Sequence, residues 1–252
     1  MKKINITRRV KAFSIHFFIS AVAFFIVLYF ILLYWYPKPH FAVSGGWQGV
    51  RVLLFVYFFS GPFLTLFLFK PLKSVRAILF DMVCVIILQI SVFTWGVYVI
   101  HAQHPVGLSL YDGVVYPIIQ RDLVPQEKTP ADIKQLDDGN PPVVFVRMAV
   151  TADEQAGVTL FDFIEGVPEA KLYFLFDPIK THVDELFAAS LENTSSPPEQ
   201  FNKIRADYLE QHNIGAGAIA FVPFTGRYGT SLLVFNRSGK IIDAVPDPRT
   251  TD

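Results

Sequence analysis

Polar side chains inside the most apolar stretches of the sequence are the residues whose types and positions point to chemistry. His16, Asp81 and Gln89 each stand among Phe, Leu, Ile and Val residues. In hydrocarbon such groups are costly unless they pair with one another or with the backbone, so they mark packing contacts or functional sites. The chemistry that we expect of them is hydrogen bonding and ion pairing between helices.

Three apolar runs must position these groups, and they cover residues 13–34, 50–69 and 77–100. Each is about 20 residues or longer, which at ~1.5 Å per residue is enough to cross ~30 Å of hydrocarbon. The first run ends in Tyr34-Trp35-Tyr36-Pro37 and has no small-residue cleavage pattern, so we interpret it as a retained membrane helix and not as a signal peptide. The sequence therefore predicts three transmembrane helices within residues 13–104.

The distribution of charge predicts the orientation of these helices. Residues 1–104 contain ten Lys or Arg and a single acid, Asp81. Most of the cations lie in the N-terminal tail, residues 1–12, and between the second and third runs. Because cytoplasmic segments carry an excess of Lys and Arg, the tail and the second loop are predicted to be cytoplasmic. With three spans, residues 105–252 would then lie on the outer side of a bacterial inner membrane, in the periplasm.

Gly61-Pro62 is a helix-breaking pair at the middle of the second run. Proline cannot donate a hydrogen bond to the carbonyl of Phe58, so a backbone acceptor is left open at the depth of Gln89. We expect a kink here, with the amide of Gln89 close to it. Tyr57, Gly61 and Thr65 recur every four residues and are predicted to form a stripe that packs on the third helix. The alternative is a packing notch that receives no partner.

His16 and Asp81 come out at nearly the same depth when residues are counted from the middle of their spans. A contact between them would offset the cost of both groups and tie the first helix to the third. Asp81 has a second option, because it can reach toward Lys73 or Arg76 at the cytoplasmic interface. The sequence leaves these two pairings open.

The segment 105–252 is predicted to be one exported α+β domain with a mainly antiparallel sheet. It is acidic, with 21 Asp or Glu against 12 Lys or Arg. Asp112-Gly113 between the apolar runs 106–110 and 114–119 predicts a hairpin. Thr129-Pro130 and Thr151-Ala152-Asp153-Glu154 predict helix starts. The remaining strands are expected at residues 143–150, 172–176, 218–224, 229–236 and 241–245, and further helices at residues 179–191 and from Ser196 to about His212.

A search for catalytic and ligand-binding motifs gives no candidate. The sequence contains no nucleophile elbow, no phosphate-binding glycine loop and no His-Glu-x-x-His motif. His101-x-x-His104 has metal-ligand spacing, but interfacial histidines are common at such positions. The one cysteine, Cys84, lies in the third run. We therefore expect no enzyme activity, cofactor or metal, and the acidic domain disfavours nucleic acid as a partner.

A further set of motifs recurs in a fixed order through residues 11–106. They are Lys11-Ala12-Phe13 with His16, Trp35-Tyr36-Pro37, Gly45-Gly46-Trp47, Gly61-Pro62 with Leu64-Thr65, Phe69-Lys70-Pro71, Phe80-Asp81, Leu88-Gln89, Gly96-Val97-Tyr98 and His104-Pro105-Val106. This order resembles the type IV pilin accessory proteins of the TfpX/TfpZ family. Arg227-Tyr228-Gly229 and the last hairpin extend the resemblance weakly into the exported domain. Family members often have an acid four residues before the Gly-Pro pair, where this chain has Tyr57.

The resemblance implies an inner-membrane, chaperone-like protein that stabilises a cognate type IV major pilin and assists its assembly. Its partners would be the pilin's transmembrane helix and globular head and the lipid bilayer, with the pilus assembly machinery as a further candidate. The alternatives are an envelope enzyme that uses Asp and Glu side chains, and a sensor or channel-associated subunit. The candidate partner-binding or intramembrane polar residues are Tyr57, Gly61, Pro62, Thr65, Gln89, His16 and Asp81.

Overall fold

The computed structural model describes residues 2–36, 46–55, 61–68, 74–191, 199–215 and 217–246. Contacts within the chain divide it into two compact units. The helical unit comprises the described residues of Met1–Pro37 and Gly46–His101, and the sheet unit comprises those of Ala102–Asp252. Each unit is described by itself below.

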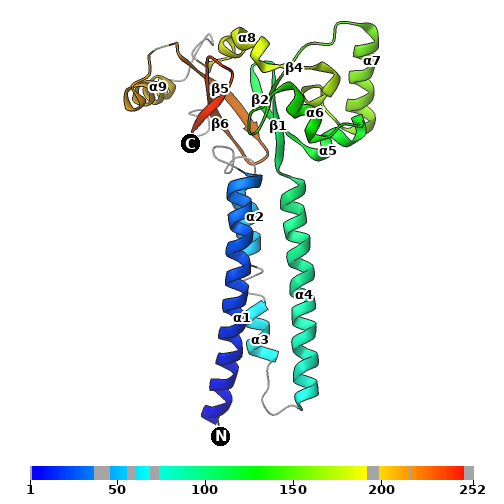
Figure 1. Ribbon diagram of the computed structural model, residues 1–252, viewed down its shortest axis with the longest axis vertical. Coiled ribbons are helices and arrows are strands. Elements are labelled where there is room, and N and C mark those ends of the chain that lie inside the picture. Colours follow the sequence, from blue (N-terminus) through cyan, green and yellow to red (C-terminus); the bar gives the residue numbers. More distant parts are fainter. Residues whose placement is uncertain are drawn as a thin grey trace. The chain divides into compact units, whose positions relative to one another are not determined.

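The helical unit consists of two long helices and two short ones (Figure 1). Its elements are α1 (Lys2–Phe30), continued by the π-helical turn η1 (Ile31–Trp35), α2 (Gly46–Leu54), α3 (Gly61–Leu68) and α4 (Val75–Ala102). The helices α1 and α4 run in the same direction, because Ser20 lies beside Gln89 and the Tyr36 hydroxyl donates to the Ile100 carbonyl at 3.2 Å. The chain returns between them through α2 and α3.

The expectation of three transmembrane helices is wrong, because the described chain has two helices long and apolar enough to cross a membrane. These are Val10–Trp35 and Val75–Ala102. The predicted second span is divided into α2 and α3, and α3 begins at Gly61 with Pro62 at its second residue. Proline is accepted in the first turn of a helix, where its missing N–H has no partner to lose. The Gly-Pro pair thus lies in the first turn of α3.

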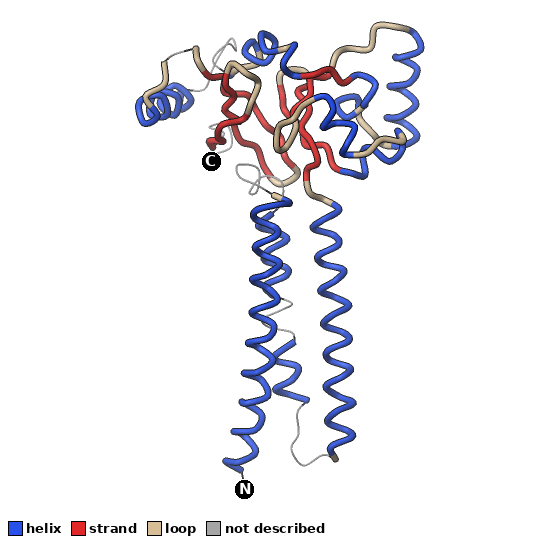
Figure 2. Tube along the Cα trace, in the orientation of Figure 1, coloured by secondary structure: helices blue, strands red, loops and turns tan. Residues whose placement is uncertain are grey.

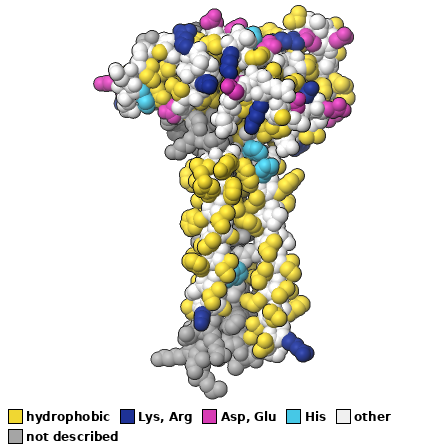
Figure 3. Space-filling view, in the orientation of Figure 1, with side chains coloured by type: hydrophobic (Ala, Val, Ile, Leu, Met, Phe, Trp, Pro, Cys, Tyr) yellow, Lys and Arg dark blue, Asp and Glu magenta, His cyan; other side chains and the backbone are white. Residues whose placement is uncertain are grey.

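Apolar side chains form the outer surface of the helical unit. Only 17% and 11% of the most apolar windows of the two long helices are buried. Figure 3 shows hydrophobic side chains over most of the face of this unit that is in view. A core helix of a water-soluble protein buries its apolar face, so the low burial is compatible with a membrane protein.

The sheet unit combines seven strands with short helices (Figure 2). The strands are β1 (Pro105–Tyr111), β2 (Val114–Ile119), β3 (Val143–Val146), β4 (Phe176–Pro178), β5 (Ile219–Gly226), β6 (Gly229–Asn236) and β7 (Ile241–Pro246). The α-helices are α5 (Gln120–Leu123), α6 (Pro130–Leu136), α7 (Ala152–Leu160), α8 (Val183–Ala188) and α9 (Glu199–His212). Among the shorter turns, η3 (Val124–Gln126), η5 (Glu169–Lys171), η6 (Tyr173–Leu175) and η7 (Ile179–Thr181) are 3-10 helices, and η4 (Phe161–Glu165) is a π-helix.

The sheet is mixed, which corrects the expectation of a mainly antiparallel one. Its order is β4-β3-β1-β2-β5-β6-β7. The hairpins β1–β2, β5–β6 and β6–β7 and the pair β3–β4 are antiparallel, whereas β1–β3 and β2–β5 are parallel. The parallel pairs join strands that are distant in the sequence, with helices in the connections, and parallel neighbours need such crossovers.

The hairpin strands β5 and β6 are buried on both faces. Ala220, Val222 and Phe224 of β5 pack in one apolar cluster with Leu186 and Phe187 of α8. Phe221, between them, packs on the opposite face with Phe201 and Tyr208 of α9. This alternation follows the two-residue period of a strand and explains why the sequence of β5 is almost continuously apolar.

Two predicted strands are shorter than expected. The run 143–150 forms a strand only as far as Val146. The run 172–176 is mostly 3-10 turn, with Leu172 and Leu175 both buried, and only Phe176 enters β4. Spacing of three between buried residues suits a helical turn, and a short apolar run does not distinguish that from a strand. The capping-box start at Thr151 and the hairpin at Asp112-Gly113 form as predicted.

Candidate functional site

One face of α1 carries two polar side chains, those of His16 and Ser20. His16 and Ser20 are four residues apart and therefore lie one above the other on the helix. Ala12 and Ala23 continue the same face, and their small side chains leave space beside the polar pair. Ser20 is buried although it belongs to a helix with an exposed apolar surface. This face of α1 is therefore turned toward α3 and α4.

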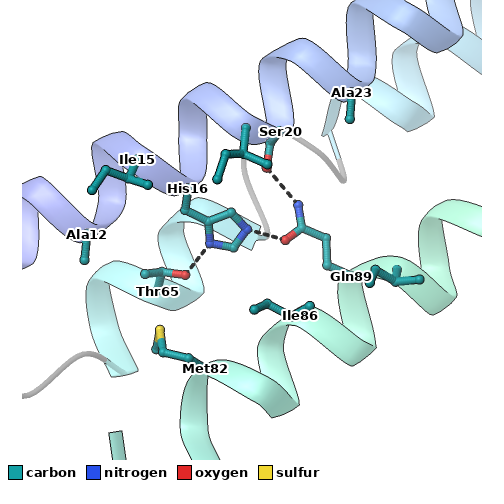
Figure 4. Close-up of a pocket in the computed structure, with 11 residues that line it drawn as sticks. Ala12, Ile15, His16, Ser20, Ala23, Thr65, Met82, Ile86 and Gln89 are labelled. Atoms are coloured by element: carbon teal, nitrogen blue, oxygen red, sulfur yellow. Dashed lines mark hydrogen bonds between the residues drawn. The ribbon is translucent and has the colours of Figure 1, made fainter. Parts of the chain in front are cut away.

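His16 forms hydrogen bonds through both ring nitrogens (Figure 4). Nδ1 lies 2.6 Å from Oγ1 of Thr65 on α3, and Nε2 lies 2.5 Å from Oε1 of Gln89 on α4. An amide oxygen only accepts, so Nε2 carries a proton and donates it to Gln89. The neutral imidazole then accepts from the Thr65 hydroxyl at Nδ1, and this is the tautomer that avoids a charge in apolar surroundings.

Gln89 completes the set of hydrogen bonds between the helices. Its Nε2 donates to Oγ of Ser20 at 3.1 Å, so the single amide contacts α1 twice. Gln89 and Thr65 are both buried. The helix start at Gly61-Pro62 places Thr65 in the second turn of α3, facing His16. We call the four side chains His16, Ser20, Thr65 and Gln89 the polar cluster.

A cavity of about 520 Å³ lies over the polar cluster. Its lining comes from α1, α3 and α4 and consists of Ala12, Ile15, His16, Ile19, Ser20, Ala23, Thr65, Met82, Ile86, Gln89 and Ile90. The isoleucines are exposed, so the cavity opens between α1 and α4 and has apolar rims. We call this opening the groove. An apolar wall with a few convergent polar groups is the usual composition of a binding site.

The structure brings together three of the residues singled out from the sequence. His16, Thr65 and Gln89 meet in the polar cluster, but their pairing differs from the predicted one. Both ring nitrogens of His16 are taken by Thr65 and Gln89, so Asp81 is not its partner. Counting residues along a helix estimates depth but not the face on which a side chain lies, and depth alone suggested the pair with Asp81.

The predicted stripe also lies differently from expectation. Within the second run, α3 packs mainly on α1 and not on the third helix, whereas Leu53 of α2 lies against Gly96 of α4. Pro62 is buried at the start of α3. Tyr57 and Phe58 lie outside the described residues, so the expected contact of Gln89 with the Phe58 carbonyl falls there too.

Ser20 is a member of the polar cluster that the sequence reading missed. Its signal was available, because a small hydroxyl side chain four residues from a histidine within an apolar helix shares its helix face. Ala12 and Ala23 would have strengthened that signal as small residues on the same face. Reading the first run by its faces, and not only by its depth, would have found the cluster.

In the sheet unit, His182 is the residue with the most suitable surroundings for acid–base chemistry. Its Nε2 lies 3.3 Å from Asp177 and its Nδ1 lies 3.2 Å from Glu185, while its ring stacks on Phe145 with 4.1 Å between centroids. Both nitrogens are thus occupied by carboxylates. In the described ranges no three His, Cys, Asp or Glu side chains gather closely enough to hold a metal ion.

Comparison with known proteins shows similarity to fimbrial assembly proteins of Dichelobacter nodosus. Over 98 residues, 39% of this chain, it is 29% identical to the fimbrial assembly protein of serogroup I and 30% identical to that of serogroup E1. It is 29% identical over the same length to the protein of serogroups C1 and C2. The matched part spans 38% of the first two relatives and 75% of the third. No family model matches the chain, and no solved structure matches it.

Proposed function

We propose that this protein assists fimbrial assembly as a membrane-anchored accessory protein of the TfpX/TfpZ type that binds and stabilises a cognate type IV pilin. The similarity to proteins named for fimbrial assembly supports the process. The groove between α1 and α4 is the observation that carries the binding role. It offers a partially open, apolar-rimmed surface with hydrogen-bonding groups at its base, in a unit whose outside is suited to lipid.

The size of the groove fits part of a helix. One turn of an α-helix with its side chains occupies about 400–600 Å³, from a diameter of ~10–12 Å and a pitch of 5.4 Å. The cavity of about 520 Å³ therefore admits the side chains of one or two turns of a pilin helix lying along the exposed rims. Small residues such as Ala12 and Ala23 allow close approach of a backbone, which is how helices associate in membranes.

The proposed location is the bacterial inner membrane, with α1 and α4 across it. The cations before Phe13 favour a cytoplasmic N-terminus. Because α1 and α4 run in the same direction, their C-terminal ends would emerge on the same side of the membrane, and the proposal assigns the sheet unit that follows α4 to the periplasm. The protein would thereby reach a pilin both within the bilayer and outside it.

The proposal assigns binding and no catalysis. In the sheet unit both ring nitrogens of His182 lie within hydrogen-bond distance of carboxylates, which gives the side chain a structural role in the proposal. The imidazole, the amide and the two hydroxyls of the groove hydrogen-bond among themselves, so the proposal assigns them to holding the helices together and to binding. An envelope enzyme using Asp and Glu side chains is the competing function.

Deletion of the protein tests the proposal. We expect the cellular level of the cognate pilin and the number of surface pili both to fall severalfold, and the wild-type chain to restore them. Ile86→Trp, which fills the groove, should restore them poorly. Leu88→Trp is the matched control, because Leu88 is similarly exposed on α4 but does not line the groove.

Normal pilin levels and normal pili in the deletion strain would end the proposal. Equal restoration by both tryptophan variants would instead remove the groove as the binding site. A photoreactive residue at position 86 should crosslink to the pilin's apolar helix, and one at position 88 should crosslink mainly to lipid.

A further inference from the structure

The helix α7, its preceding residues and the π-helical turn η4 that follows it expose an unusual amount of apolar surface in the sheet unit. Phe163 is 90% exposed, Val150 78%, Met148 76%, Ile164 66% and Leu160 54%. These residues flank and end one short helix. A monomeric protein rarely exposes contiguous apolar side chains of this size unless they meet a partner. We call Leu160, Phe163 and Ile164 the α7 patch.

The α7 patch is held in place by a well-anchored helix. Thr151 caps α7 through the backbone N–H of Glu154, and Glu154 in turn accepts from the N–H groups of Val150 and Thr151. Arg147 also donates to Glu154, at 2.5 Å, and these hydrogen bonds lower the pKa of Glu154 to about 2. The exposed residues are thus presented by an ordered element and do not belong to a frayed end.

The inner face of the same helix packs on the sheet unit and fixes which residues face outward. Gly157 lies against the ring of Phe174, where an added Cβ would come within 3.3 Å. Phe161 packs on Phe174 with 6.2 Å between ring centroids. The helix then ends in the π-helical turn Phe161–Glu165, closed by Gly166 in the left-handed region at φ 65. This turn carries Phe163 and Ile164, and π-turns often occur at functional sites.

Negative charge borders the α7 patch. From Met148 to Ala170 the sequence has five Asp or Glu residues and no Lys, Arg or His. Asp153, Asp162 and Glu165 are exposed, and none of them has an ion pair within the described part of the chain. Figure 3 shows acidic side chains at the end of the sheet unit where Figure 1 places α7.

The charge selects among the possible occupants. An anionic lipid surface would repel Asp162 and Glu165 beside the apolar residues. A twofold contact between two copies would bring the same acids face to face, which is unfavourable. A surface that buries Phe163 and Ile164 must therefore present basic side chains around an apolar depression.

We propose that the α7 patch is a second docking surface, which takes an apolar depression bordered by Lys or Arg on the exported part of the fimbrial subunit. This inference rests on the proposed function and adds a site in the sheet unit to the groove in the helical unit. The apolar anchors supply most of the affinity, and the acids supply selection and speed of association.

The test measures binding of the full chain to the full-length cognate subunit, both reconstituted in nanodiscs. Phe163→Ser with Ile164→Ser should weaken binding at least about tenfold, a loss typical of central apolar anchors. Asp162→Lys with Glu165→Lys should weaken it about as much at low salt, and the loss should shrink at 0.5 M salt, as expected for ~4 Å Debye screening.

Matched controls come from the other end of the sheet unit, where Figure 1 shows α9. Ile242→Ser removes an exposed apolar side chain of β7, and Asp207→Lys with Glu210→Lys reverses two exposed acids of α9. Both should bind like the wild type. Hydrogen-exchange protection of β5 and β6 confirms in every variant that the sheet unit is folded.

Any other outcome contradicts part of the inference. If the wild type binds the subunit and the patch variants bind equally well, the inference is wrong while the proposed function stands. If the patch variants change only self-association or binding to anionic vesicles, the occupant is wrong. If the wild type binds no subunit at all, the proposed function and this inference fail together, and Ile86→Trp then has no effect either.

Discussion

The helical unit and the sheet unit differ in what lies on their surfaces. In the helical unit large apolar residues such as Phe18 and Phe67 are exposed, while Ser20, Thr65 and Gln89 are buried together with apolar residues such as Phe24 and Ile31. In the sheet unit Phe221 and its apolar neighbours are fully buried, and most acids are outside. Both units thus have apolar side chains inside, but the helical unit also carries many of them on its surface and hydrogen-bonds its helices through buried polar groups, a pattern compatible with a surrounding of lipid.

The largest effect expected from this contrast comes from one substitution made in both units. Phe221→Ala removes a ring that packs on Phe201 and Tyr208, and should lower the stability of the sheet unit by about 3–5 kcal/mol. Phe18→Ala removes an exposed ring of α1 and should cost less than about 1 kcal/mol in detergent. Hydrogen-exchange protection of β5 and β6 measures the first change.

Tryptophan fluorescence measures the second change, because all three tryptophans, Trp35, Trp47 and Trp95, lie in the helical unit. Equal losses in the two units would contradict the contrast, since the exposed ring of Phe18 would then contribute as much to stability as the buried ring of Phe221.

The next largest effect is the coupling energy between His16 and Gln89, which tests whether the polar cluster stabilises the helical unit. A double-mutant cycle with His16→Ala and Gln89→Ala should give a coupling energy of about 0.5–2 kcal/mol, the range for hydrogen bonds between membrane helices. The unfolding of the helical unit, followed by tryptophan fluorescence, provides the four stabilities. His16→Ala with Asp81→Ala is the control cycle and should be additive. A coupling confined to the control pair would show that the pairing at His16 is assigned wrongly.

A smaller effect concerns pH and the start of α7. The pKa of Glu154 is lowered to about 2, chiefly by its hydrogen bond with Arg147 and also by two backbone N–H groups. A lowered pKa in the folded state stabilises the fold above the ordinary pKa of the group, and this contribution is lost as the pH falls toward about 2. Glu154→Gln should therefore lower Tm by a few degrees at most at pH 6, and by less at pH 3.

The difference in Tm between wild type and Glu154→Gln isolates this group from the other carboxylates that titrate over the same range. A difference that grows as the pH falls would have the wrong sign for the proposed cause.

The smallest expected effect concerns Phe163, and it tests whether this side chain contributes to the stability of the sheet unit or to binding. Phe163 is the most exposed of the large apolar residues described in the sheet unit, whose other phenylalanines are mostly buried. Phe163→Ser should change the stability of the sheet unit by less than about 0.5 kcal/mol, because it removes little buried area. A loss above about 2 kcal/mol in denaturant unfolding would mean that Phe163 is part of the core and not of a docking surface.

Local patterns predicted the elements better than their partners. The apolar runs indicated both long helices, and turn residues indicated β2 and β6 with the bounds that the structure has. The parallel pairs β1–β3 and β2–β5 were out of reach, because nothing local in a strand records which distant strand it meets. Gly61-Pro62 was recognised as a helix breaker and expected at a kink in the middle of a span, whereas the structure has it in the first turn of α3.

The site shows the same limit. A polar side chain in an apolar segment is unfavourable unless it is paired, and this argument singled out His16 and Gln89. The two side chains do contact each other. The position of a residue along its helix could not indicate that Thr65 and Ser20 complete the polar cluster. The partners of a side chain depend on which faces of α1, α3 and α4 are turned toward one another. The α7 patch was missed because exposure is a property of the folded chain, and Phe163 reads in the sequence as an ordinary core residue.

The hydrogen bonds at His16 also select one arrangement of the helices among many. Two apolar helices can pack in lipid at almost any rotation about their axes with similar contact area. Rotating α1 about its axis by the angle between successive residues, about 100°, would separate His16 and Ser20 from Gln89. Several polar groups would then lack hydrogen-bond partners among apolar side chains. The polar cluster thus acts as a rotational lock, and it keeps the groove open on the same side in every copy of the protein.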